Sequence, residues 1–323
     1  MSAPTDYLLD RRRMRRKLGW WRMAAIAAGG LALLVGFSKL GGADSTDKLT
    51  PHVARLSIQG MITGDKDTID LIKKIGESSQ AKALLLTIDS PGGTTTGSEK
   101  LYEELRRVGE KKPVVAVVGS VAASGAYIAA LAADTIVARG NSLVGSVGVL
   151  FQFPNFHRLL DTVGVKVEEI KSSPLKASPN GFEPTSEAAK AAIASLVADS
   201  YSWFKDLVKE RRKLDDAELA KVADGRVFTA RQGLPLKLVD VIGGEREAIV
   251  WLETNKKLAK DLPVREWKKG ASLERLGLVE SAAGAARAFG LGSLAGFLDQ
   301  ASGAERSSGL DGLLAIWQGL DGR

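Results

Sequence analysis

Three segments of this 323-residue chain place small and polar residues directly after an apolar run that has the pattern of a β-strand. They are Asp89-Ser90-Pro91-Gly92-Gly93, Ala122-Ala123-Ser124-Gly125, and a third that comprises Gly145-Ser146-Val147-Gly148 and then the strand ending at Ile170-Lys171 with the loop 172–179. In open α/β sheets, ligands bind and catalytic residues lie at the carboxyl ends of the strands. The chemistry of this protein is therefore expected in these three segments.

Ser124 is the residue among them best suited to act as a nucleophile. Its segment runs from a strand into a helix, so the N–H of Gly125 and the helix dipole would favour negative charge developing there. The pattern is not Gly-x-Ser-x-Gly, because Ala122 and Ala126 occupy the glycine positions. A serine at a helix start is also a common N-cap, so this segment alone leaves a capping role open.

Two adjacent glycines, Gly92 and Gly93, follow the first of the three strands. Glycines allow backbone N–H groups to face outward into a concavity, as an oxyanion hole requires. The same pair is equally expected in a purely structural turn, so both interpretations stay open on this segment alone.

The composition restricts which group can serve as the base. The chain has no cysteine, and its two histidines, His52 and His157, occur without an HExxH pattern. Thiol catalysis, structural disulfides and a histidine-rich metal centre are therefore not expected, and neither is any metal or organic cofactor. A lysine can replace histidine as general base where burial populates its neutral amine. Lys176 is the candidate, although a loop lysine is usually a solvated charge.

The elements that must position these residues alternate along the chain. Apolar runs typical of strands lie at 53–58, 83–88, 114–118, 135–138 and 165–170, and helical patterns lie at 68–76, 97–109, 124–133 and 186–212. Thr185 or Ser186 can cap the last of these helices. This alternation predicts an α/β fold with a largely parallel sheet covered by helices.

The net charge of +7 is concentrated at the beginning of the sequence. Residues 1–22 contain seven Lys or Arg and two Asp, so the remainder is nearly balanced and a nucleic-acid partner is not expected. The basic run leads into Trp20-Trp21 and then into 23–38, which carries no charge. This pattern is typical of a single transmembrane helix with its basic flank in the cytoplasm. The alternatives are a cleaved signal peptide and a buried helix.

These features divide the chain into five parts. We expect a basic cytoplasmic tail at 1–18, a transmembrane signal anchor at 19–39, a linker at 40–50, a catalytic domain at 51–260 and a C-terminal extension at 261–323. The protein would then be a single-pass protein of the inner or plasma membrane, in contact with lipid, with a periplasmic or otherwise extracytoplasmic catalytic domain. The apolar stretch near the end of the extension predicts either short amphipathic helices or a mobile tail.

Taken together, the ordered segments resemble the signal peptide peptidase A family, membrane-anchored serine proteases with a Ser-Lys dyad. The resemblance covers about 53–248 and includes GRVFTARQG at 225–233 and LVDVIGG at 238–244. It implies a ββα superhelix like that of the crotonases and caseinolytic proteases, and assembly into a homo-oligomeric ring. It also implies peptide substrates, such as the remnants of cleaved signal peptides.

The resemblance further implies a role for each candidate residue. Ser124 matches the nucleophile, Lys176 the general base, and Ser146 the hydroxyl that orients the lysine amine. The backbone N–H groups of Gly93 and Gly125 would form the oxyanion hole.

The loop around Lys176 departs from the family pattern. It reads KSSPLKA at 171–177, without the glycine and the aspartate that often accompany the lysine. Lys171 and Lys166 are therefore the alternative bases.

Two other functions compete with a protease. One is an acyl-CoA hydratase or isomerase, because the crotonase fold also uses glycine-rich oxyanion turns; an extracytoplasmic location, where CoA is not expected, argues against it. The other is a catalytically inactive scaffold tethered to the membrane.

Overall fold

The computed structural model describes residues 20, 47–269 and 314–316 of a chain that divides into two compact units, 1–50 and 51–323. In the first unit it describes Trp20, which is helical, and the short 3-10 helix η2 (Asp47–Leu49). Apart from Trp20, the anchor expected at 19–39 lies outside the described residues. Within the described ranges, no helix is both long enough and apolar enough to cross a bilayer.

The described elements of the second unit alternate between strands and helices along most of their length. In chain order they are β1 (His52–Gln59), α3 (Lys66–Glu77), β2 (Ala81–Ser90), β3 (Gly92–Thr94), α4 (Thr95–Gly109), β4 (Val114–Ala123), α5 (Gly125–Leu131), β5 (Thr135–Ala138), β6 (Leu143–Gly145), α6 (His157–Thr162), α7 (Glu187–Arg212), α8 (Asp216–Val222), β7 (Val227–Thr229), α9 (Ala230–Gly233), β8 (Val241–Ile242), α10 (Glu245–Asn255), β9 (Val264–Glu266) and β10 (Leu314–Ile316). The predicted α/β fold is confirmed.

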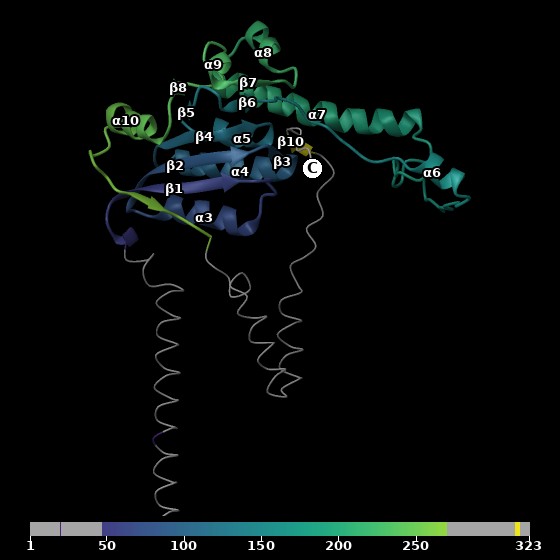
Figure 1. Ribbon diagram of the computed structural model, residues 1–323, viewed down its shortest axis with the longest axis horizontal. Coiled ribbons are helices and arrows are strands. Elements are labelled where there is room, and N and C mark those ends of the chain that lie inside the picture. The colour runs from purple at the N-terminus through teal and green to yellow at the C-terminus, as the bar shows by residue number, and fades with distance from the viewer. Residues whose placement is uncertain (1–19, 21–46, 270–313, 317–323) are drawn as a thin grey trace, which may run out of the picture. The chain divides into compact units, whose positions relative to one another are not determined.

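Most of the described strands belong to one largely parallel sheet. Its order is β7-β6-β4-β2-β1-β9, with β5 beside β4 and β8 beside β5 (Figure 1). Only β7 is antiparallel to its neighbour in this sheet. The short strands β3 and β10 pair with each other in a separate antiparallel ribbon.

Strand β4 is long enough to pair with two strands in succession. Val115–Val118 pair with β5, and Val121–Ala123 pair with β6. Gly119 and Ser120 lie between the two pairings and are exposed. The sheet divides at this point, and the second half of β4 ends together with β6.

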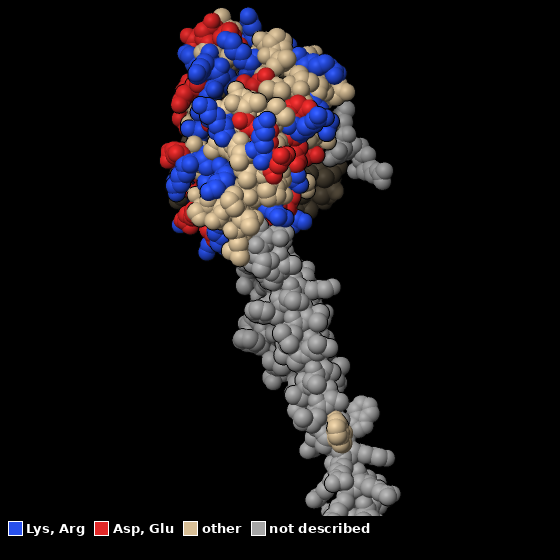
Figure 2. Space-filling model, turned by 90° about the vertical axis from the view of Figure 1, so that its left-hand side faces the viewer, with Lys and Arg blue, Asp and Glu red and all other residues tan. Residues whose placement is uncertain are grey.

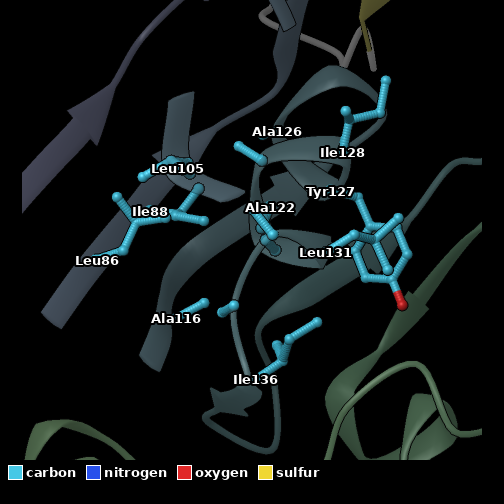
Figure 3. Packing of buried hydrophobic residues seen from close by; sticks show 14 of the residues in the cluster. Leu86, Ile88, Leu105, Ala116, Ala122, Ala126, Tyr127, Ile128, Leu131 and Ile136 are labelled. Atoms are coloured by element: carbon cyan, nitrogen blue, oxygen red, sulfur yellow. The ribbon is translucent and has the colours of Figure 1, made fainter. Parts of the chain in front are cut away.

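Side chains alternate between the two faces of the sheet, as strand geometry requires. On β2, Leu84, Leu86 and Ile88 join a large cluster with the helices α3, α4, α5 and α7, in which Tyr127 and Leu131 of α5 lie side by side (Figure 3). Leu85 belongs to a smaller cluster on the opposite face, with α10. Burial on both faces explains why these strands are continuous apolar runs in the sequence.

The predicted helix at 186–212 is confirmed with its cap. The Ser186 side chain accepts a hydrogen bond from the N–H of Ala189 at 3.1 Å, so α7 begins at Glu187. Lys213 ends the helix in the left-handed conformation, with a φ of 52°.

The strand predicted at 165–170 is wrong. The structure has no regular element there, and Val165, Val167 and Ile170 are 48%, 47% and 106% exposed. The sheet described above does not include this segment, so its apolar residues have no neighbouring strand. Alternation of apolar residues produces a strand only where one face is buried.

On the face of the molecule shown in Figure 2, acidic and basic side chains are interspersed. Some opposite charges of the described residues are paired in salt bridges, for example Arg212 with Asp240 at 2.7 Å. Charge on this face therefore does not form a patch of one sign.

Candidate active site

The first two segments singled out in the sequence, and 145–148 of the third, lie at the carboxyl ends of three neighbouring strands; the strand ending at Ile170 that the third segment also included does not form. Strand β4 lies between β2 and β6 in the sheet. Ser90 at the end of β2 pairs with Ala122, and Ala123 at the end of β4 pairs with Gly145 at the end of β6. Because these strands are parallel, the residues that follow them meet at one edge of the sheet.

Ser124 occupies the turn between β4 and α5 in a conformation that is unusual for serine. Its φ is 54° and its ψ is −119°, values close to those of the first central residue of a type II′ turn, where glycine is favoured. Its N–H donates to the carbonyl of Gly145 at 2.8 Å, and its own carbonyl accepts from the N–H of Tyr127 at 2.9 Å. These backbone bonds hold a strained residue at the end of the strand.

The side chain of Ser124 does not act as a helix cap. It makes no capping hydrogen bond, and its Oγ lies 3.4 Å from the carbonyl oxygen of Gly148, to which it donates. The residue is 1% exposed. The alternative that the sequence left open, a serine that serves only as an N-cap, is therefore wrong, and the hydroxyl is aimed at the segment that follows β6.

Ser146 begins that segment and has the same φ of 54°. It is 7% exposed, and its N–H donates to the carbonyl of Arg226 at 2.8 Å. Arg226 precedes β7, which pairs antiparallel with β6. The GRVFTARQG motif thus supplies the strand that fixes the backbone of Ser146.

Position 93 requires glycine, because the backbone of Ile62 lies too close to leave room for any side chain. A Cβ on Gly93 would lie 1.8 Å from the carbonyl oxygen of Ile62, which pairs with it through a parallel bridge. In this bridge the N–H of Ile62 donates to the carbonyl of Gly92, and the N–H of Thr94 donates to the carbonyl of Ile62. Both hydrogen bonds are 2.9 Å long. Because successive residues of a strand direct their hydrogen-bonding groups to opposite sides, the N–H of Gly93 points away from Ile62.

Sequence reasoning missed the role of Ser90. This buried side chain donates to the carbonyl of Gly60 at 2.6 Å and accepts from the N–H of Gly92 at 3.1 Å, so it fixes the turn that leads into Gly93. A serine between a strand and a Pro-Gly-Gly turn was the available signal.

Gly125 follows Ser124 as the first residue of α5, whose seven residues are all buried. The first N–H groups of a helix have no partner within the helix. The N–H of Gly125 is thus available on the side of the turn where Ser124 lies.

Lys176 is not brought to Ser124 or Ser146. It lies in an exposed loop between α6 and α7, where its N–H donates to the carbonyl of Ser173 at 3.1 Å. Among the described residues, its side chain forms no hydrogen bond or salt bridge with either serine. Figure 1 shows α6 and the adjoining loop at the far end of α7, projecting from the sheet.

The two alternative lysines differ from each other. Lys171 forms salt bridges with Glu169 at 2.8 Å and Glu183 at 2.6 Å. The hydrogen bond that the Lys171 amine donates to Glu169, followed by the one that it donates to Glu183, raises the pKa of this amine. Lys171 is therefore held in its charged form and is poorly suited to accept a proton. Lys166 is exposed.

No group of acidic or histidine side chains with the arrangement of a metal site occurs in the described ranges. His52 is buried and is the first residue of β1. Its Nε2 accepts a hydrogen bond from the indole N–H of Trp267 at 3.1 Å. His157 is on α6, with Nδ1 at 2.6 Å from the side-chain oxygen of Asn155. Neither histidine contacts Ser124.

A serine on a strained turn between a strand and a helix is also the nucleophile of α/β-hydrolases. Residues 106–259 match the model of peptidase family S49. The chain is 36% identical over 203 residues to a putative protease of Synechocystis sp., a match that covers 62% of this chain and 73% of that protein. It is 30% identical over 230 residues to a putative signal peptide peptidase of Enterococcus faecium, covering 67% of each.

The chain therefore belongs to peptidase family S49, the signal peptide peptidase A family, and is a serine protease of that family. The comparison favours the protease over the acyl-CoA enzyme. Among solved structures, a membrane-bound stomatin-specific protease is 16% identical, with a TM-score of 0.42 over 68% of this chain and 98% of that one. This TM-score is too low to establish a shared fold.

Proposed function

We propose that this protein is a serine endopeptidase in which Ser124 is the nucleophile and Lys176 the general base. The observation that carries the proposal is the backbone conformation of Ser124, a buried residue whose hydroxyl has no capping role. Strained residues persist where the surrounding structure holds them, and they cluster at active sites. The neighbouring strand ends supply Gly93 and Ser146.

The proposed reaction is acyl transfer from a peptide to Ser124. The neutral amine of Lys176 takes the hydroxyl proton as the oxygen attacks the peptide carbonyl, and Ser146 orients that amine. The N–H groups of Gly93 and Gly125 stabilise the oxyanion of the tetrahedral intermediate. The ammonium then protonates the leaving amine, and water hydrolyses the acyl-enzyme with the lysine again acting as the base.

This mechanism requires that Lys176 reach Ser124. In this structure the projecting segment that carries Lys176 holds it away from that serine. We name residues 156–182 the arm. Large apolar side chains along the arm are exposed, which is unusual for a surface that faces only water. They are Phe156, Leu159, Val163, Val165, Val167, Ile170, Leu175 and Phe182. We therefore extend the proposal to a homo-oligomer, as a ring, in which the arms are covered by other copies.

The proposed fold type is the ββα superhelix of the crotonases and caseinolytic proteases. Support for it comes from the division of the sheet at β4, where one strand pairs first with β5 and then with β6. This arrangement turns the end of β4 and the end of β6 toward a common site.

Hydrophobic peptides, such as cleaved signal peptides, are the proposed substrates. The support is the family and the similarity to the Enterococcus protein, whose name describes a signal peptide peptidase. An anchor at 19–39 would hold the site close to such peptides at the membrane, with 1–18 in the cytoplasm and the enzyme outside. External protease applied to intact spheroplasts tests this topology: digestion of the catalytic domain supports it, and protection until lysis contradicts it.

The decisive experiment for the activity compares two serines of one strand and turn. Ser124→Ala in the full chain should abolish hydrolysis of a fluorogenic peptide and labelling by a covalent serine probe. Ser120→Ala, four residues earlier and exposed, should retain both. Full hydrolysis by Ser124→Ala, or an unlabelled and inactive wild-type protein, would contradict the proposal.

A further inference from the structure

A second segment of the chain lies along β3, the strand that contains Gly93. Strand β10 (Leu314–Ile316) pairs with β3 in antiparallel register, with Leu314 opposite Thr94, Ala315 opposite Gly93 and Ile316 opposite Gly92. Strand β10 also contacts α4 and α5 (Figure 1). A segment more than 200 residues away in sequence thus reaches the strand end beside Ser124.

The two edges of β3 have different partners. The carbonyl of Gly92 and the N–H of Thr94 face Ile62 on one side. The N–H and the carbonyl of Gly93 consequently face the other side, where β10 lies. The residue directly opposite Gly93 is Ala315.

This edge is also the one that a peptide substrate needs. In the proposed mechanism, the N–H of Gly93 receives the oxyanion, so it must be free to meet the carbonyl of the substrate. A strand that pairs with Gly93 occupies that position. Binding of β10 and binding of an extended peptide at this edge are therefore mutually exclusive.

The sequence of the segment suits the role of a peptide ligand. Residues 313–317 read LLAIW, without charge, and glycines stand at 312 and 319. Peptides that bind by adding a strand to an exposed edge gain affinity through their main chain, so an apolar extended segment of this kind is sufficient. Three paired residues form few hydrogen bonds, and such a contact can be displaced.

We propose that the segment around Leu314–Ile316 is an internal competitive ligand of the protease, bound as an antiparallel strand on β3 and displaced by substrate. The inference rests on the proposed function, because it takes Gly93 as part of the active site. It assigns to this segment the regulation of access to that site.

The kinetic consequence follows from the fraction of molecules in which the edge is free. If the segment is paired in about nine molecules of ten, the apparent affinity for substrate is reduced about tenfold. Removing residues 303–323 from the full chain should then lower KM for a short fluorogenic peptide about tenfold and leave kcat unchanged. Ala315→Pro removes the N–H at the paired position and should act in the same direction. Ser307→Pro, outside the paired residues, is the control and should leave KM at the wild-type value.

A binding experiment tests the register without requiring hydrolysis. A fluorescent peptide of residues 310–320 is titrated, with anisotropy as the readout, onto the chain that lacks 303–323 and carries Ser124→Ala. Because Gly93 directs its groups to Ala315, N-methylation at Ala315 should abolish binding. N-methylation at Leu314 or Ile316 should be tolerated.

The outcomes separate this inference from the proposed function. Unchanged KM on deletion and on Ala315→Pro, or equal binding of all three N-methylated peptides, overturns the inference. Hydrolysis by wild type with no binding of the peptide also overturns it and leaves the protease intact. Binding with the predicted N-methyl pattern, in a protein that hydrolyses nothing, supports the strand site and contradicts the proposed function instead.

Discussion

Ser124 and Ser146 occupy equivalent positions on two neighbouring parallel strands. Each is the first residue after a pair of register partners, Ala123 and Gly145, and each has a φ of 54°. The N–H of Ser124 donates to the carbonyl of Gly145 at 2.8 Å, which ties the two turns together. The two serines are thereby held on neighbouring strands at one edge of the sheet.

The strained backbone of Ser124 leads to a prediction about stability. Ser124→Gly and Ser124→Ala both remove the hydroxyl, but only glycine adopts the observed φ and ψ without strain. After allowance for the greater freedom of glycine in the unfolded chain, we expect the glycine variant to be more stable than the alanine variant by about 1 kcal/mol. Thermal unfolding should show a Tm higher by roughly 2–4 °C. A lower Tm for the glycine variant would show that the turn is not strained.

Most of the sheet and its helices could be predicted from the sequence because these elements are buried by their near neighbours. The runs at 83–88 and 114–118, which lie in β2 and β4, are almost entirely apolar, since both faces are covered. The cap at Ser186 is a local signal and was also predictable. The strand predicted at 165–170 failed because the pattern carries no information about whether a partner strand exists.

The sequence indicated segments that meet at one edge of the sheet, but it did not indicate their geometry. The sequence around a serine that follows a strand is the same whether its side chain caps the helix or points elsewhere. The orientation of the side chain depends on the pairing of Ala123 with Gly145. The pairing of β10 with β3 depends on a still more distant contact, and the sequence indicated a helix or a mobile tail for that stretch. Such long-range pairings are decided by the whole fold rather than by local propensity.

The roles of the lysines are tested by a pair of matched substitutions. Arginine keeps the positive charge but cannot lose its proton at working pH. Lys176→Arg should therefore reduce kcat/KM by roughly 10²–10⁴, the usual contribution of a general base. Lys171→Arg can keep the salt bridges with Glu169 and Glu183 and should retain activity. Loss of activity in Lys171→Arg, with activity retained in Lys176→Arg, would move the base to Lys171.

The Lys171 and Glu183 pair should make the order of the arm depend on pH. The hydrogen bond from Lys171, followed by that from Ser178, lowers the pKa of Glu183, and the pKa of Lys171 is raised. The contribution of Glu183 is lost as pH falls through its lowered pKa, and that of Lys171 is lost as pH rises through its raised pKa. Limited proteolysis of the arm should thus be slowest between these two values. Lys171→Met should remove this minimum; a minimum that persists in the variant would assign it to other groups.

Tyr127 links α5 to the segment before β8. Its hydroxyl is fully buried and donates to the carbonyl of Leu238 at 2.9 Å, and burial raises the pKa of the phenol. Tyr127→Phe leaves this carbonyl without its partner and should lower the free energy of unfolding by about 1–3 kcal/mol. Tyr102→Phe, at a partly exposed position, should change it by less than about 0.5 kcal/mol. If denaturant titrations give equal changes in the free energy of unfolding for the two variants, the buried hydrogen bond of Tyr127 does not stabilise the fold.

The exposed apolar residues of the arm predict how the protein assembles and whether assembly is needed for activity. Ile170 is fully exposed, and in the proposed oligomer another copy covers it. Ile170→Asp should therefore dissociate the full chain in detergent, measured by sedimentation, and reduce hydrolysis in parallel, because Lys176 on the same arm would no longer be delivered to Ser124. Val250→Asp, at a 50% exposed position on α10, is the matched control and should leave both properties unchanged. A monomeric Ile170→Asp variant with full activity would show that the arm supplies its lysine within one copy.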